Sequence, residues 1–231
     1  MKSTDTRLLS RGYAFDAYIQ KCIKYDEEKL LCLLHDNEAY KRTIAVKLLP
    51  LRDRYIPLLC DMLETEKKLY TKIELCNTLV KYREKAIPYL IPLLGVIGNN
   101  QHKKPGLIDL KKRTYPLPRD ICGRILIRIG PAVFPELKKL LLENINKKQI
   151  AEAIDVIGHI AWNHKNHDMD NILVEFYHKN REDEFLEWKI VRAFQSCVSE
   201  DAKTILKNII ETRSNKVIVE EAKRSLNRMN L

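Results

Sequence analysis

Glycine is scarce in this sequence, with 7 residues among 231, and long hydrophobic runs are absent. With 45% hydrophobic residues, this composition supports a continuous core and argues against long disordered tails. No apolar stretch approaches the roughly 18 residues that a membrane-spanning helix requires. The first seven residues also lack the apolar run of a signal peptide. We therefore expect a soluble, intracellular protein, with no transmembrane segment.

Paired cysteine motifs are also missing. The six cysteines are scattered singly, and no two have the C-x-x-C spacing of a zinc or redox site. Most lie within apolar helical runs, as Cys32 does, which is typical of buried thiols that act as small hydrophobic side chains. This usage fits a reducing compartment, so we expect a cytoplasmic protein.

The sequence lacks the local motifs of common enzymes. It contains no glycine-rich phosphate loop, no nucleophile elbow and no pair of catalytic carboxylates at a defined spacing. We therefore predict a binding protein rather than an enzyme, with no cofactor, no metal and no catalytic residues.

What the sequence does contain is a repeat. Residues 53–59, 84–90 and 131–137 read DRYIPLL, EKAIPYL and PAVFPEL, with Pro57, Pro88 and Pro135 at equivalent places. The interval from the second proline to the third is longer than the first by about half a period, which indicates an insertion. The apolar residues around these segments have a helical period, and strand-like alternation is absent.

We predict an all-α fold of about six helical pairs over residues 1–231, as a single repeat domain. A helix over residues 8–25 is expected to cap the first pair. The first helices of the pairs are predicted near 26–37, 53–66, 84–98, 131–145, 166–183 and 199–214, and the second helices near 38–52, 67–83, 118–130, 146–163, 184–198 and 215–230. Pro92 is expected to kink the third of the first helices.

The pattern resembles HEAT repeats, and among them the short variety of phycobilisome-lyase-type proteins. Residues 126–141, LIRIGPAVFPELKKLL, show the turn and the first helix of such a repeat most clearly. The later repeats lack the proline, since Asn171 and Thr204 stand near its place. The resemblance implies an α–α superhelix in which the second helices line the concave face. It implies no reaction, because such proteins are mostly adaptors and scaffolds.

Charge is divided unequally between the two sets of helices. The net charge is +10, and the second helices of the pairs carry the basic excess whereas the first helices are acidic overall. If the second helices line the inner face, the protein has a basic concave surface that suits an acidic protein segment, a nucleic-acid backbone or an anionic membrane. Basic residues on these helices could equally be solvated surface residues. The residues we predict to bind a partner on these helices are Lys41, Arg42, Lys68, Lys72, Arg119, Arg124 and Arg128.

The insertion at about residues 99–117 is the second candidate. A helix–helix connection of this length is often functional. Lys103, Lys104, Lys111, Lys112 and Arg113 could hold an acidic or phosphate-bearing ligand over the basic surface. Alternatively, its apolar residues 107, 108 and 110 simply pin the loop to neighbouring helices.

Two enzymatic alternatives have weaker support. His159, His164 and His167 with Asp168 and Asp170 are possible metal ligands, but the segment reads as a turn with capping residues. HEAT-like DNA glycosylases of the alkylation-repair type use Trp, Asp and Arg, and Trp162, Trp188, Asp155 and Arg192 supply those types without the required Trp-Trp-Asp run. Trp188 lies in an apolar run typical of core packing.

The leading hypothesis is a non-enzymatic HEAT-repeat adaptor that binds an acidic protein or peptide segment. The alternative is a nucleic-acid-binding HEAT protein, possibly similar to a DNA glycosylase. A tetrapyrrole lyase or isomerase, which the lyase-type repeats also allow, ranks third.

Overall fold

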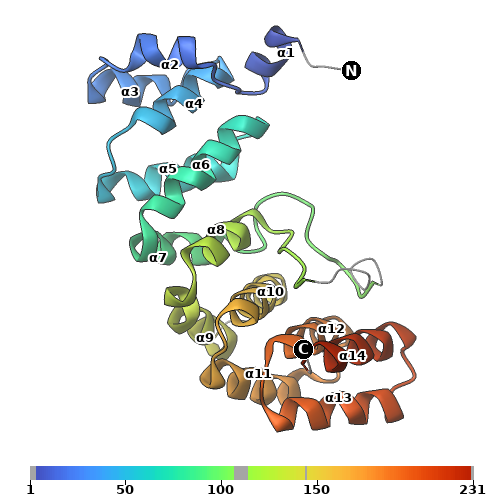
Figure 1. The fold of residues 1–231 in the computed structure, drawn as a ribbon. Helices are drawn as coiled ribbons and strands as arrows, with labels where there is room; N and C mark the ends of the chain where they lie inside the picture. The colour runs from blue at the N-terminus through green and yellow to red at the C-terminus, as the bar shows by residue number, and fades with distance from the viewer. Residues whose placement is uncertain (1–3, 107–113, 144, 230–231) are drawn as a thin grey trace. The chain divides into compact units, whose positions relative to one another are not determined.

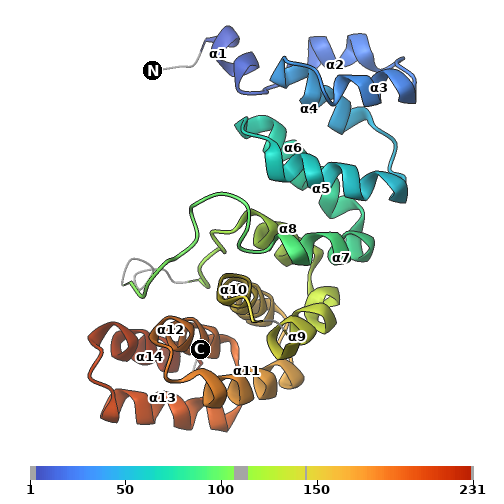
Figure 2. The same ribbon diagram turned by 180° about the vertical axis from the view of Figure 1, so that it is seen from behind.

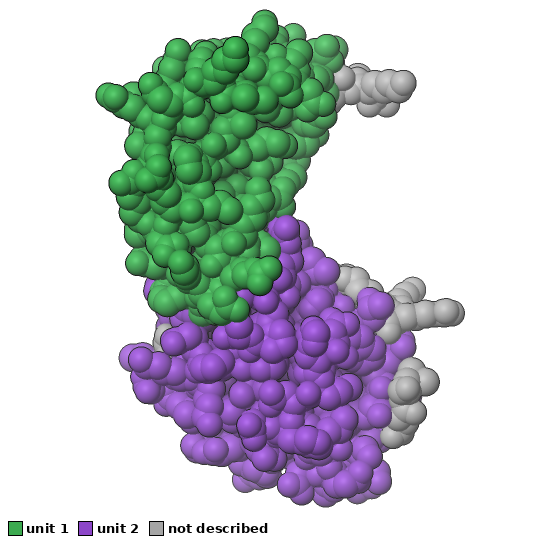
Figure 3. Space-filling model, turned by 60° about the vertical axis from the view of Figure 1, so that its left-hand side comes forward, with its two compact units in different colours: residues 1–89 green, residues 90–231 purple. Residues whose placement is uncertain are grey.

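The computed structural model describes residues 4–106, 114–143 and 145–229, and the secondary structure of these residues is helical, with no strand (Figure 1). They form two compact units, residues 1–89 and residues 90–231, shown in different colours in Figure 3. None of the helices described is long and apolar enough to cross a lipid bilayer.

The first unit contains six helices before the boundary. They are α1 (Asp5–Ser10), α2 (Asp16–Cys22), α3 (Glu27–Leu33), α4 (Ala39–Leu48), α5 (Ile56–Thr65) and α6 (Leu69–Lys81). Short 3₁₀ turns, η1 (Asp53–Tyr55) and η2 (Arg83–Ala86), precede α5 and the short helix α7 (Ile87–Leu90). Helix α4 packs against α3 and α6, and α5 packs against α6.

The second unit is larger. It contains η3 (Ile91–Leu93), α8 (Ile121–Ile129), η4 (Pro131–Val133), α9 (Phe134–Glu143), α10 (Lys147–Asn163), α11 (His167–Asn180), α12 (Glu184–Ala193), η5 (Phe194–Ser196), α13 (Glu200–Thr212) and α14 (Lys216–Met229). Helices α8, α10, α12 and α14 pack in that order, and α9, α11 and α13 pack in order beside them. The unit therefore has two layers of helices, which Figure 2 shows from behind.

The prolines that define the repeat begin helices, as predicted. Pro57, Pro88 and Pro135 are the second residues of α5, α7 and α9. Each of these helices follows directly on a 3₁₀ turn, so the local structure repeats along with the sequence. Proline fits here because the first turn of a helix has backbone N–H groups without intrahelical partners.

Two predicted helices differ from the observed ones. The capping helix over 8–25 is instead two short helices, because the chain turns between them at Gly12, which has φ +91° and is buried. The helix predicted over 84–98 ends early, since α7 stops at Leu90 and a 3₁₀ turn containing Pro92 follows. The kink predicted at Pro92 is thus a complete break.

The N-terminal helices contact α4 and α6 within the first unit. Thr43 and Thr71 join α4 to α6 through a hydrogen bond of 2.9 Å between their hydroxyl groups. The backbone N–H of Tyr70 donates to the carbonyl of Arg11, and the ring of Tyr70 lies 5.1 Å from that of Tyr13. The helices α1 and α2 also pack against α4, so the N-terminal segment is attached to both α4 and α6.

Side-chain caps define where many helices begin. Asp26, Asp120, Asn146, Asn166, Asp183 and Ser199 each accept a hydrogen bond from a backbone N–H in the first turn of the following helix. Such a cap is worth about 1 kcal/mol. The prediction that residues around Asn166 form a turn with a helix cap is confirmed.

The cysteines differ in burial. Cys32 is exposed on α3, whereas Cys60 and Cys197 are buried. Burial raises the pKa of the Cys60 thiol to about 12 and that of Cys197 well above its usual value. The prediction that most thiols are core residues is correct for Cys60, Cys122 and Cys197 and wrong for Cys32, while Cys22 and Cys76 are half-buried.

Candidate functional site

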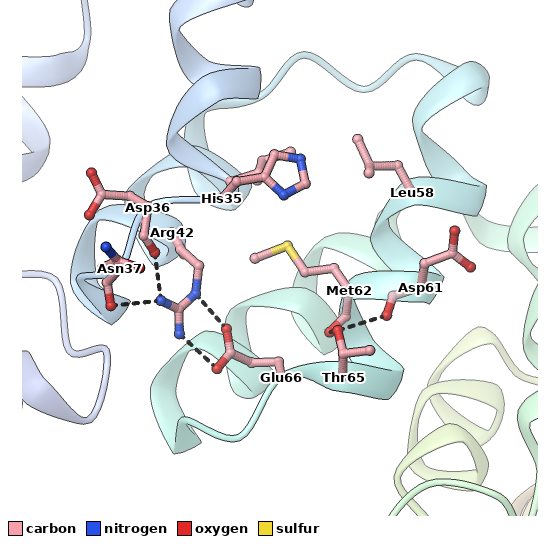
Figure 4. Close-up of a pocket in the computed structure, with 10 residues that line it drawn as sticks. His35, Asp36, Asn37, Arg42, Leu58, Asp61, Met62, Thr65 and Glu66 are labelled. Atoms are coloured by element: carbon pink, nitrogen blue, oxygen red, sulfur yellow. Dashed lines mark hydrogen bonds and ion pairs between the residues drawn. The ribbon is translucent and has the colours of Figure 1, made fainter.

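Among the predicted binding residues of the first unit, Arg42 makes an internal ion pair. Its Nε and Nη2 donate to the two carboxylate oxygens of Glu66 at 2.8 and 2.9 Å, and Nη1 donates to the carbonyls of Asp36 and Asn37 (Figure 4). Glu66 is buried, and it also accepts from the backbone N–H of Lys68. Burial alone would raise the pKa of Glu66, but these hydrogen bonds keep it below its usual value. Arg42 therefore joins the turn before α4 to the turn before α6.

The other predicted residues of this unit are more accessible. Lys41 forms ion pairs with Glu38 and Asp36 at 2.5 and 3.4 Å, and the hydrogen bond with Glu38 is the main reason that its pKa rises to about 12. Lys68 is exposed and Lys72 half-buried, and neither has an ion pair with the described part of the chain.

In the second unit, three predicted residues gather around one hollow. Lys103, Lys104 and Arg119 line a hollow of about 290 Å³ together with His102, and none of the described residues that line it is acidic. Arg124 and Arg128 are exposed on α8, where the Arg124 Nε donates to the carbonyl of Pro118. Lys111, Lys112 and Arg113 lie outside the described residues.

A larger hollow of about 610 Å³ adjoins the first and shares Gln101, His102 and Lys103 with it. Its other lining residues are Gly95, Val96, Gly98, Asn99, Lys147, Lys148, Ala151, Glu152 and Phe185. It therefore lies between the described start of the insertion and the first turns of α10, with Phe185 of α12 completing the wall. Sequence analysis did not predict this hollow.

Asp120 holds this part of the insertion in place. Its carboxylate is completely buried, and one oxygen caps α8 by accepting from the backbone N–H of Gly123 at 2.8 Å. The other oxygen accepts from the Gly95 N–H at 3.1 Å and from Gln101 Nε2 at 2.9 Å. Gly95 has φ +71°, and its Cα faces the backbone of Lys148 so closely that an added Cβ would lie 3.0 Å from the Lys148 carbonyl carbon. Asp120 thus fixes the start of the insertion to α8, and at Gly95 this segment lies directly against the α10 backbone.

The floor of the larger hollow continues into a buried charged cluster. Lys189 of α12 is completely buried, and its ammonium donates to Asp155 and, at 3.3 Å, to Oε1 of Glu152. His102 Nδ1 lies 3.5 Å from the same ammonium group. Two carboxyl groups therefore share one lysine, and Glu152 Oε2 and Asp155 Oδ1 have no hydrogen-bond partner among the described residues.

Burial in this cluster changes the pKa of Glu152. Burial raises its pKa to about 7, Lys189 opposes this shift, and the neighbouring Asp155 adds to it. Glu152 therefore takes up a proton near neutral pH, so its side chain can present either a carboxylate or a carboxylic acid to the hollow.

Trp188 and Arg192 lie in a second buried group on the same helix. Trp188 is completely buried, and its indole N–H donates to Glu221 at 3.2 Å. The Arg192 guanidinium lies 4.0 Å from the Trp188 ring and pairs with Glu221. The prediction that Trp188 is a core residue is confirmed. Trp162 is only half-buried, and the Lys165 ammonium lies over its ring.

The histidine segment shows no metal site. Within the part of the chain that the structure describes, no group of three or more His, Cys, Asp or Glu side chains is arranged to hold a metal ion. Asp170 is buried and accepts from the Val198 N–H at 2.8 Å, which joins α11 to the segment after α12.

Comparison with known proteins gives no family. No protein-family model matches the chain, and no curated protein matches it. Among solved structures, one match is an engineered protein of the Northeast Structural Genomics Consortium, 16% identical over 88% of this chain and 98% of its own, with a TM-score of 0.40. That similarity is too low to support a functional argument.

Proposed function

We propose that this protein is a non-enzymatic, HEAT-like adaptor that binds an acidic protein or peptide segment. The observation that carries the proposal is the smaller hollow, where Lys103, Lys104 and Arg119 meet and no acidic residue is found among the described lining residues. Lys103 and Lys104 are exposed and have no ion pair with any described residue. Their charge is therefore available to a partner.

The chemistry of these side chains favours carboxylates. A guanidinium group such as that of Arg119 can donate two parallel hydrogen bonds to one carboxylate, and lysine ammonium groups donate to several acceptors. The paired order of helices, with 3₁₀ turns and proline at equivalent places, supports the HEAT-like interpretation. In that interpretation the second helix of each pair belongs to the inner layer, and Lys68 and Lys72 of α6 give this layer basic charge in the first unit.

The test is a fluorescence-anisotropy titration with a labelled peptide of alternating Glu and Asp, at low and physiological salt. We expect micromolar binding that the double substitution Lys104→Glu/Arg119→Glu weakens at least tenfold, since it places two acidic groups where the peptide binds. Lys138→Glu/Lys139→Glu, an equal charge change on exposed residues of α9, is the matched control and should change the affinity less than twofold. Equal binding by both double variants would refute the proposal.

The same titration examines the nucleic-acid alternative. Labelled single-stranded and duplex DNA and RNA would bind through phosphate contacts, with log affinity falling linearly with log salt for unrelated sequences. Tighter binding of nucleic acid than of the acidic peptide at physiological salt would replace the adaptor proposal with the nucleic-acid one.

A further inference from the structure

The larger hollow of the second unit combines three features that bear on what it can bind. It is about 610 Å³ in volume, which is more than a single side chain fills and falls within the usual range for small-molecule sites. It has a polar floor, an apolar wall and a basic rim. Each feature restricts the ligand that would fit.

The floor offers an unused carboxyl oxygen. Glu152 is 1% exposed and lines the hollow, and among the described residues only its Oε1 has a partner, Lys189. A buried polar atom without a partner is unfavourable, and a donor from a ligand would relieve that cost. The last torsion of a glutamate side chain is broad, so a small rotation brings Oε2 to a ligand that offers an N–H group.

The wall is apolar and includes one aromatic ring. Phe185 is half-buried, Ala151 is buried, and Val96 is 48% exposed although it is a large apolar residue. A planar ring placed between such side chains covers apolar surface and stacks on the phenyl ring.

The rim is basic, and part of its charge is unused. Lys103 and Lys148 are exposed and have no ion pair with the described residues, whereas the Lys147 ammonium pairs with Asp183 at 2.5 Å. An anionic group at the mouth of the hollow would therefore meet two available ammonium groups. A cationic amine would be repelled there, and an acidic side chain would supply no donor for Glu152.

We propose that this hollow binds a nucleoside monophosphate, with the planar base inside and the phosphate at the rim. The N–H groups at the edge of the base donate to Glu152, the ring packs beside Phe185, and the phosphate accepts from Lys103 and Lys148. A free nucleotide and the terminal nucleotide of a single strand present the same chemistry. The two hollows share Lys103, but neither Lys104 nor Arg119 lines this one, so Lys104→Glu/Arg119→Glu tests the acidic-peptide surface separately.

The first experiment is isothermal titration of the full chain with AMP, GMP, CMP and UMP at low salt, with adenosine and inorganic phosphate as partial ligands. At least one of the four nucleotides should bind with a Kd below about 1 mM, and at least tenfold more tightly than either partial ligand. A Kd above about 1 mM for all four nucleotides would overturn the proposal.

Variants locate the site. Lys103→Ala/Lys148→Ala should weaken nucleotide binding about tenfold, whereas Lys138→Ala/Lys139→Ala should leave it unchanged. Glu152→Gln keeps the shape of the side chain but adds an amide donor, so it should change the ranking of the four bases. Circular dichroism confirms that each variant is folded. Unaltered affinity in Lys103→Ala/Lys148→Ala, or an unaltered ranking of the bases in Glu152→Gln, would contradict the assignment.

The source of the nucleotide is distinguished by competition. A pentanucleotide with a 5′-phosphate should displace a bound mononucleotide only if a strand end enters the hollow, and the same pentanucleotide without the phosphate serves as its control. Displacement by the phosphorylated strand supports a terminal nucleotide, and no displacement supports a free one. Displacement by both strands alike would contradict phosphate recognition at the rim.

Discussion

Lys189 is a buried cation with two carboxyl partners. Loss of the lysine should therefore destabilise the protein much more than loss of one of the two carboxylates. Lys189→Met should lower the free energy of unfolding by about 3–5 kcal/mol, because Glu152 and Asp155 would then lie buried without a cation. Urea denaturation of the purified variant measures the change.

Glu152→Gln is the control for that measurement. It leaves Lys189 paired with Asp155, so the free energy of unfolding at neutral pH should change by less than about 1 kcal/mol. A loss as large as that of the lysine variant would show that the cluster needs both carboxylates.

The pH dependence of stability should also reveal Glu152. Its pKa is about 7 in the folded protein against 4.5 as the usual value, so the folded state holds a proton that the unfolded state has released. The contribution of Glu152 to stability is therefore complete below pH 4.5, declines as pH rises, and is lost above about pH 7. Urea titrations at pH 5 and pH 8 should show that wild type loses more stability than Glu152→Gln, by on the order of 1–3 kcal/mol. Parallel pH profiles of the two proteins would contradict this interpretation.

Residue type alone does not tell whether a basic side chain is available to bind a partner or makes hydrogen bonds within the fold. Arg42 and Lys68 both looked like surface cations, yet Arg42 makes four hydrogen bonds within its unit while Lys68 stays exposed. The partner of Arg42, Glu66, is 24 residues away, and no local pattern announces such a pair. The same reason explains why Glu152 and Lys189 were missed.

At the scale of elements, substitutions at two glycines of one segment can distinguish the cost of backbone strain from the cost of steric crowding. Gly95 and Gly98 have φ +71° and +80°, but an added Cβ would meet the Lys148 backbone only at Gly95, and nothing within 4 Å at Gly98. Gly98→Ala should cost about 1 kcal/mol for the strained conformation. Gly95→Ala should cost clearly more, because the wall of the larger hollow must move away from α10.

Urea unfolding measures both changes, and nucleotide affinity gives a second readout for Gly95→Ala. Equal losses of stability at the two positions would mean that the segment moves freely relative to α10, against the fixed geometry described above.

Most helices were predictable because their signals are local. Apolar residues at helical spacing, capping residues and the repeated prolines indicated α3 to α6 and α8 to α14 close to their observed places. The break between α1 and α2 was missed, since it depends on Gly12 fitting against Thr71, a contact that no nearby residue reveals. The described part of the insertion is non-helical, as predicted, but its anchoring to Asp120 is a long-range feature.

At the scale of the whole molecule, the two compact units raise the question of whether the chain unfolds in one step or two. The sequence predicts one repeat domain over residues 1–231, and in such arrays each repeat depends on its neighbours. If the units are separate cooperative units, Lys189→Met should speed hydrogen exchange in α10 to α14 and leave α4 to α6 unchanged. Hydrogen-exchange mass spectrometry gives the answer for each helix. Faster exchange throughout the chain would show that the array unfolds as a single unit.

The uneven burial of the thiols has a practical consequence. Because the thiolate is the reactive form, the raised pKa values of Cys60 and Cys197 protect them at neutral pH, while Cys32 on α3 is open to reagents. A maleimide dye should therefore attach to the first unit at Cys32 in preference to these two. With a second dye on a cysteine introduced at exposed Glu211 of α13, energy transfer would report the separation of the two units in solution, with and without a bound partner.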